Sequence, residues 1–267
     1  MSRPKHVSRT WRLLAPTVAI VLFLVAWEYA VAAGHLRPIQ CPPPSKIARS
    51  LLELVIEGFP EGTRLDAHFF ITVLRILAGF ALAVAVAIPL GLLIGSSPML
   101  DKLTSPVVAF CRSVATLSLL PLAVVWFGTG EATKVFLIGY GCFWVMLSNV
   151  IAAIKQIDAV LIRAARTMDT SKRDIFLKVM LPSALPRLVS GARVALGVGF
   201  MVIVGAEMIG TTRGLGALIM EARTFYRSDI TMVGMFVIAA LGLALSAGLT
   251  RLEAWLVPWQ AAQRGAR

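Results

Sequence analysis

The chain has 267 residues, of which 58% are hydrophobic and 15% charged, with a mean hydropathy of +0.81. This much apolar surface cannot be hidden in the core of an ordinary soluble domain, so we expect an all-α, polytopic membrane protein. The formal net charge of +12 could suggest a nucleic-acid partner, but the placement of the basic residues argues against one.

Six apolar runs reach the ~20 residues that a helix needs to cross a bilayer. They cover residues 13–33, 69–95, 105–127, 132–154, 188–209 and 230–251. The first run is longer than the apolar part of a signal peptide and lacks a convincing cleavage site, so we expect a retained span. Six spans return both termini to the same side.

Basic residues are concentrated on one side of this topology. Fifteen Lys or Arg side chains lie in the segments 1–12, 96–104 and 155–187 and at the C-terminal end, against eight on the other side. By the positive-inside rule, the tails 1–12 and 253–267 and the loop 155–187 face the cytoplasm of a bacterial inner membrane. The partner of this charge is then the anionic lipid surface, with no nucleic acid involved.

The segment 34–68, expected in the periplasm, follows the first span. The prolines at 42–44 interrupt the chain, and Ser45 is expected to cap a new helix. Apolar residues recur there at helical spacing: Ile47, Leu51, Leu54 and Val55. A helix that anchors along the membrane surface is favoured, and one that meets a soluble partner is the alternative.

The core, residues 69–252, contains stripes of small residues that predict close helix packing. They lie in the second, fifth and sixth spans: Gly79, Ala83, Ala87, Gly91 and Gly95; Gly191, Ala195 and Gly199; Ala240, Ala244 and Gly248. Pro89 and Pro121 predict kinks in the second and third spans.

The loop 155–187 predicts two short amphipathic helices. Leu161, Ala164, Ala165 and Met168 form an apolar stripe. Ser171 and Asp174 then have the spacing of a helix-capping pair. The second helix is expected to close at Leu181–Pro182, because proline restricts the residue before it.

This loop resembles that of the permease subunits of binding-protein-dependent ABC importers. The family pattern is Glu-Ala-Ala, three residues, Gly, nine residues, Ile, one residue, Leu-Pro. It falls without a gap on Arg163–Ala165, Asp169, Val179 and Leu181–Pro182. Arg163 replaces the Glu, and Asp169 replaces a Gly at a turn where a positive φ is often needed; Asp tolerates this conformation at a cost of order 1 kcal/mol.

Other segments resemble the branch that imports nitrate, sulfonates, taurine, bicarbonate or thiamine precursors. They are Cys41–Ser45, Pro89–Gly91, Leu120–Leu122, Trp126–Glu131, Ala206–Met208 and Gly214–Gly216.

The resemblance implies that two copies of the chain form a translocation path for a small anionic solute. Two cytoplasmic ATPase subunits would hold ATP and Mg, and a periplasmic or surface-tethered solute-binding protein would deliver the solute. The chain has no phosphate-binding loop, catalytic constellation or metal-ligand spacing, so we expect no enzymatic activity or cofactor of its own. The implied ATPase-coupling residues are Arg163, Ala164, Ala165, Arg166, Asp169, Ser171, Arg173, Asp174, Phe176 and Pro182.

Polar residues in or near the spans are candidates for the path, since a charge at the bilayer centre costs ~2.5 to 3.5 kcal/mol. The path or gate residues that we expect are Asn149, Glu207, Thr211, Gly214 and Gly216. For Glu207 the alternative is a structural pair with an arginine. Glu28 is expected to anchor at the interface, while Arg75 and Arg193 are expected to snorkel.

Two other functions remain open. An ATP-independent transporter or channel would leave the organised loop unexplained. A membrane scaffold without transport activity predicts that Arg163 and Asp169 can be changed with no effect on flux.

Overall fold

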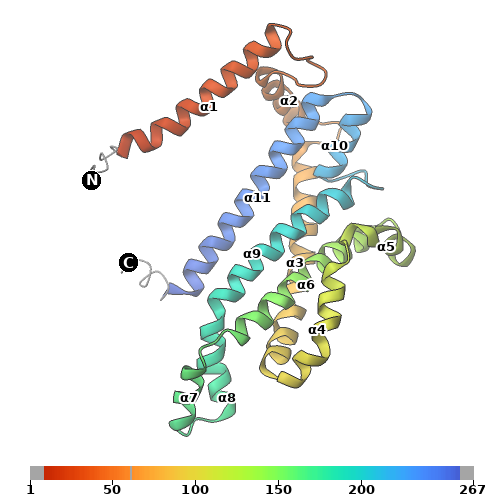
Figure 1. Ribbon diagram of the computed structural model, residues 1–267. Coiled ribbons are helices and arrows are strands. Elements are labelled where there is room, and N and C mark those ends of the chain that lie inside the picture. The colour runs from red at the N-terminus through yellow and green to blue at the C-terminus, as the bar shows by residue number, and fades with distance from the viewer. Residues whose placement is uncertain (1–8, 61, 259–267) are drawn as a thin grey trace. The chain divides into compact units, whose positions relative to one another are not determined.

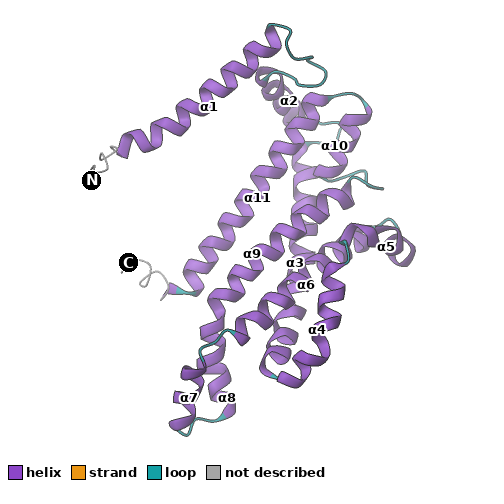
Figure 2. Ribbon diagram, viewed as in Figure 1, coloured by secondary structure: helices purple, strands orange, loops and turns teal. Residues whose placement is uncertain are grey.

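The computed structural model describes residues 9–60 and 62–258, and every regular element within them is a helix (Figure 2). Two compact units are present. The first takes the described residues up to Asp66 together with Leu218–Phe236, and the second takes Ala67–Ala217 and the described residues from Val237 onward. Most of the predicted tail 1–12, and the end of the tail 253–267, lie outside the described residues.

The described helices confirm the all-α membrane architecture. Four are long and apolar enough to cross a bilayer: α3 (Leu65–Ser96), α6 (Glu131–Lys155), the continuous helix Ile175–Glu207 and α11 (Ser228–Leu256). A bent pair of helices could supply a fifth span, and the apolar helix Thr17–Ala32 is shorter. The count of six spans stays a prediction.

In the first unit, α1 (Arg9–Ala32) is connected to α2 (Pro44–Ile56) by hydrogen bonds between Glu28 and Ser45. Ser45 does not cap α2, since the N-cap position is Pro43. Instead, the Ser45 backbone N–H and hydroxyl donate to Glu28 at 3.1 and 2.7 Å. Glu28 therefore links two helices, and its place at the membrane interface stays a prediction.

One face of α2 packs against the turn between α10 (Leu215–Thr224) and α11. Ile47, Ser50 and Leu54 are buried, whereas Leu51 and Val55 are exposed. The contact of this helix with the membrane stays a prediction. An ionic network holds this face: Ser50 donates to Asp229 at 2.6 Å, and Arg227 bridges Asp229 and Glu53.

In the second unit, the small residues let α3 and α6 approach closely. A Cβ atom at Gly79 would lie 2.7 Å from Cβ of Ile138, and one at Gly91 would lie 2.6 Å from Cβ of Val150. The helix α9 (Leu181–Glu207) packs on α6 in the same way, with Gly191 against Asn149. These contacts confirm the prediction for two stripes. The stripe of the sixth span is exposed, and a Cβ atom at Gly248 would meet no atom of the described residues within 4 Å.

The predicted third span is not one straight helix. It is divided into α4 (Pro98–Ser113), the 3-10 helix η1 (Thr116–Leu119) and α5 (Leu120–Phe127), with a bend of 82°. The break is at the extended residues Val114 and Ala115. Pro121 lies in the first turn of α5, where its missing N–H costs no hydrogen bond, so our assignment of the kink to Pro121 was wrong.

The loop after α6 also differs from its prediction at Pro182. The short helix α8 (Lys172–Asp174) leads into a π-helical segment, η2 (Ile175–Met180), and then directly into α9. The Leu181 N–H bonds to the Phe176 carbonyl five residues back, and Pro182 lies in the first turn of α9. Leu181–Pro182 therefore does not close the element, and the helix runs without interruption from Ile175 to Glu207.

Candidate functional site

The loop between α6 and α9 has a defined fold. Its first helix, α7 (Ala159–Thr167), is capped by Asp158, which accepts from the Val160 N–H at 2.8 Å. Ser171 donates to Asp174 at 2.9 Å, and the Asp174 N–H donates back to the Ser171 hydroxyl at 3.1 Å, which confirms the predicted capping pair. Hydrogen bonds from Lys178 and then Ser171 hold the pKa of the Asp174 carboxyl below its usual value. The carboxylate therefore stays an acceptor at neutral pH.

The turn between the two loop helices requires a left-handed residue. Asp169 has a φ of 53°, as expected for a position where the family pattern has glycine. This conformation reverses the chain between α7 and α8 (Figure 1).

The surface of the loop is not covered by the rest of the described chain. Leu161 and Met168 are 48% and 80% exposed. Arg163, Arg166 and Arg173 are also exposed, and none makes an ion pair with another described residue. An apolar stripe beside unpaired guanidinium groups is a surface suited to a protein partner.

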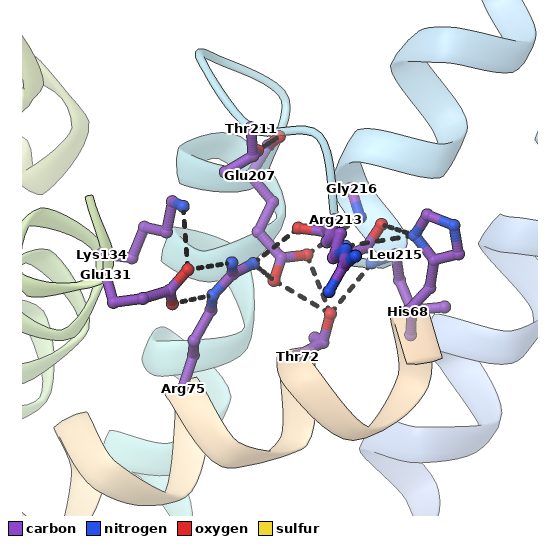
Figure 3. Close-up of polar contacts among 11 residues, drawn as sticks. His68, Thr72, Arg75, Glu131, Lys134, Glu207, Thr211, Arg213, Leu215 and Gly216 are labelled. Atoms are coloured by element: carbon purple, nitrogen blue, oxygen red, sulfur yellow. Dashed lines mark hydrogen bonds and ion pairs between the residues drawn. The ribbon is translucent and has the colours of Figure 1, made fainter. Parts of the chain in front are cut away.

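A largely buried ionic network, of which Glu131 is the exposed member, lies at the opposite end of these helices. The 25 residues of α6 run from Glu131 to the loop over about 37 Å, at ~1.5 Å per residue, and α9 returns to Glu207. Arg75 on α3 donates to Glu207 at 2.7 Å and to both oxygens of Glu131 at 2.5 and 2.6 Å (Figure 3). Lys134 lies 3.5 Å from Glu131, so two cations face two carboxylates.

The Glu207 carboxylate organises the segment that follows α9. It accepts from the Thr72 hydroxyl at 2.9 Å and from the Gly216 N–H at 3.0 Å. A Cβ atom at Gly214, where φ is +126°, would lie 2.5 Å from Cδ of Glu207. Glycine is therefore required there for both its conformation and its size.

The same segment is also held by α3. The Leu215 N–H donates to the Thr72 hydroxyl at 2.9 Å, and the Gly214 N–H donates to Nδ1 of the buried His68 at 3.1 Å. The Thr211 hydroxyl donates to the Glu207 carbonyl. The chain from 211 to 216 thus wraps around one buried carboxylate.

Most of the predicted gate residues come together here. Glu207, Thr211, Gly214 and Gly216 share the network. Asn149 does not join them, because it lies in mid-α6, bonds to Val145 of its own helix and contacts Gly191.

The alternative interpretation of Glu207, as the partner of an arginine, is confirmed by its bond to Arg75. Arg75 is only 2% exposed, so the expectation that it snorkels was wrong. Arg193 pairs with Glu253 at 2.5 Å.

Sequence reasoning missed four members of the network: His68, Thr72, Glu131 and Lys134. A signal for two of them was present, since residues 68, 72 and 75 have the i, i+4, i+7 spacing of one polar face on an otherwise apolar helix. Glu131 gave no such signal, because only the fold brings the start of α6 beside α3.

The described residues contain no group of three His, Cys, Asp or Glu side chains that could hold a metal ion. The candidate site has two parts, which lie at the two ends of α6 and α9. One is the uncovered surface of the loop, and the other is the network that orders the glycine-rich segment.

Comparison with known proteins gives consistent relatives. Residues 87–261 match the family described as the binding-protein-dependent transport system inner membrane component. The taurine transport system permease protein TauC of Escherichia coli is 35% identical, over 95% of this chain and 91% of the relative. The bicarbonate transport system permease protein CmpB of Synechocystis is 32% identical, over 95% and 94%. The putative aliphatic sulfonates transport permease protein SsuC of Bacillus subtilis is 30% identical, over 95% and 88%.

A solved structure shares the fold. A chain of the MetNI methionine ABC transporter, in an inward-facing conformation, superposes with a TM-score of 0.62 at 22% identity, covering 72% of this chain and 95% of that one.

Proposed function

This chain belongs to the family of inner membrane components of binding-protein-dependent transport systems, and from that premise we propose that it works as a homodimeric permease for a small anionic solute. Relatives are named for taurine, aliphatic sulfonates and bicarbonate, and each of these solutes has an anionic group. A separate cytoplasmic ATPase, present in two copies with ATP and Mg, supplies the energy. A solute-binding protein delivers the solute from outside.

The observation that best supports coupling to an ATPase is the exposed surface of the loop. The apolar stripe of α7 and the guanidinium groups of Arg163, Arg166 and Arg173 are uncovered in a single chain. In our proposal the coupling residues named from the sequence contact the ATPase, with the loop and both termini in the cytoplasm.

The helix Ile175–Glu207 offers a route from the loop to the buried network. Its 33 residues would extend over about 50 Å at ~1.5 Å per residue. A movement of the loop then displaces Glu207, and with it the glycine-rich segment 210–216, which we propose to be the outer gate. This requires two arrangements of the helix, and the π-helical turn at Ile175–Met180 is a place where its pitch can change.

The decisive test is reconstitution. The chain should be purified in mild detergent, its co-purifying proteins identified by mass spectrometry, and the complex placed in liposomes with the binding protein. We expect an ATPase to co-purify, and uptake of radiolabelled taurine or bicarbonate to require ATP. Downhill flux through the purified chain alone would contradict this proposal and favour an ATP-independent transporter.

A further inference from the structure

A groove of about 670 Å³ opens in the first unit, between the end of α10 and the first turns of α11. Its volume is within the range of ~300 to 1,000 Å³ usual for small-molecule sites. Its lining includes the polar residues Arg223, Tyr226 and Thr231 and three methionines, Met220, Met232 and Met235. In the expected topology, the connection between the fifth and sixth spans faces the outside.

The groove has a positive charge that the described residues do not neutralise. No acidic side chain is among the residues that line it. Arg223 makes no ion pair or hydrogen bond with another described side chain, whereas Arg227, one turn later, is bonded to both Glu53 and Asp229. Glu53 and Asp229 are thus bound to Arg227, and Arg223 remains available to an anion.

The free hydrogen-bond donors of the groove are few and specific. The hydroxyls of Thr224, Ser228 and Thr231 already donate to backbone carbonyls. The donors left without a partner in the described structure are the Arg223 guanidinium, the Tyr226 hydroxyl and the Gln40 amide. A guanidinium group with two neutral donors matches a sulfonate or carboxylate head group.

The turn that presents these donors is ordered by its surroundings. Tyr226 has a left-handed backbone, with φ of 56°, and its side chain is 79% exposed. The next residue, Arg227, bonds to Glu53 of α2 at 2.9 Å and to Asp229 at 3.0 Å, and Phe59 packs edge-on against Phe225 at 5.7 Å. These contacts from both sides hold an unfavourable conformation in place.

We propose that this groove receives the anionic solute at the outer face before translocation. The head group binds Arg223, Tyr226 and Gln40, and a short alkyl chain lies against the methionines, whose flexible thioethers adapt to small apolar groups. The site rests on the proposed import function and refines it to one class of solute: a small sulfonate or carboxylate with a short alkyl tail.

The test measures the charge of the groove without using transport. A Met235→Cys probe in a Cys41→Ser background is reacted with anionic sulfonatoethyl and cationic trimethylammonioethyl methanethiosulfonates, in the full-length protein in nanodiscs, and labelling of residue 235 is followed by mass spectrometry. The labelling rate of each reagent is divided by the rate at which the same reagent reacts with glutathione. The ratio of the two corrected rates, anionic over cationic, is then compared between variants. A unit charge near the thiol should favour the anionic reagent by about threefold to tenfold.

Three variants locate the source of that preference. Arg223→Gln should bring the ratio of rates close to one, and Arg223→Lys should keep it. The matched control is Arg49→Gln, which removes another exposed arginine of the first unit that has no ion pair among the described residues. A ratio near one in the unchanged groove, or a ratio that Arg223→Gln does not alter, would overturn the proposal.

Protection experiments then identify the ligand class. Millimolar propane-1-sulfonate should slow the labelling of residue 235, propan-1-ol should not, and Arg223→Gln should abolish the protection. Equal slowing by the sulfonate and the alcohol would show an apolar pocket instead and would overturn the anion site. No ATPase takes part, so an anion-selective groove without ATP-driven uptake would contradict only the proposed function.

Discussion

The Glu207 carboxylate shows how a single side chain can order a loop at the end of an apolar helix. It accepts from Arg75, Thr72 and the Gly216 N–H while almost fully buried. Removing one partner of a buried pair leaves the other without compensation, which is more costly than the net value of the pair. The residues of the network should therefore depend strongly on one another.

A double-mutant cycle tests this dependence. Glu207→Gln should destabilise the protein by about 1 to 3 kcal/mol, since Arg75 loses one charged acceptor and keeps Glu131. Its coupling energy with Arg75→Gln should be about 1 to 3 kcal/mol. Thermal unfolding in nanodiscs measures both values. The control pair, Glu207→Gln with the exposed Arg112→Gln, should be additive, and additivity in the first pair would refute the network.

Asp169 is the second residue whose backbone determines what is tolerated. Its φ of 53° suits Gly and Asn but strains a β-branched side chain. Asp169→Val should destabilise the loop by about 1 to 2 kcal/mol and reduce ATP-driven uptake. Asp169→Gly should be neutral or slightly stabilising.

The matched control for this position is Asp169→Asn, which removes the charge and keeps the left-handed preference. Uptake rates and protease resistance of the loop distinguish the cases. If Asp169→Asn impaired uptake as much as Asp169→Val, the charge rather than the conformation would be the important property.

Among the elements, α3 and α6 depend on the absence of side chains at their contact. At Gly91 a new Cβ atom would meet Val150 at 2.6 Å, which is closer than carbon atoms can approach. Lipid tails are as apolar as Leu, so the hydrophobic effect does not drive helices together in a membrane. Helix association there depends on van der Waals packing, and small residues allow it by letting the two backbones approach closely.

Two glycine substitutions separate packing from helix propensity. Gly91→Ala should destabilise the protein by about 1 to 3 kcal/mol, because α3 must move away from α6. Gly197→Ala, on α9 with nothing within 4 Å of the new Cβ, should be neutral or stabilise by up to about 1 kcal/mol through helix propensity. Unfolding midpoints by tryptophan fluorescence compare the two. Equal effects would mean that α3 and α6 are not in contact at Gly91.

At the scale of the whole molecule, the loop and the buried network are connected by one uninterrupted helix, Ile175–Glu207. A partner that moves the loop therefore acts on an element whose far end holds the glycine-rich segment. The loop surface is basic at Arg163, where the family pattern has an acidic residue, so we expect the ATPase of this importer to present an acidic group there.

Reversing that charge tests the expectation. Arg163→Glu should weaken co-purification of the ATPase by about tenfold, with a loss that depends on salt concentration. Arg37→Glu, an exposed site outside the loop, is the control and should leave co-purification unchanged. Stronger coupling in Arg163→Glu would indicate instead that Arg163 is a weakening departure from the family pattern.

From the sequence alone we obtained the membrane class, the helical loop with its capping pair, the left-handed turn at Asp169 and the small-residue faces of the second and fifth spans. The turn at Asp169 was implied by the resemblance to the family pattern. The others depend on local spacing and on solvent preference, which are properties of short segments. A pair of Glu207 with an arginine was available only as one alternative, and the arginine was not identified.

The tertiary structure alone decided the remaining features: the participation of Glu131 and Lys134 in the network, the break at Val114 and Ala115, and the continuation of the helix through Pro182. It also placed Arg223 in a groove without acids while Arg227 took both carboxylates. These features depend on which partners compete for each polar group, and that competition exists only after residues distant in sequence have been brought together.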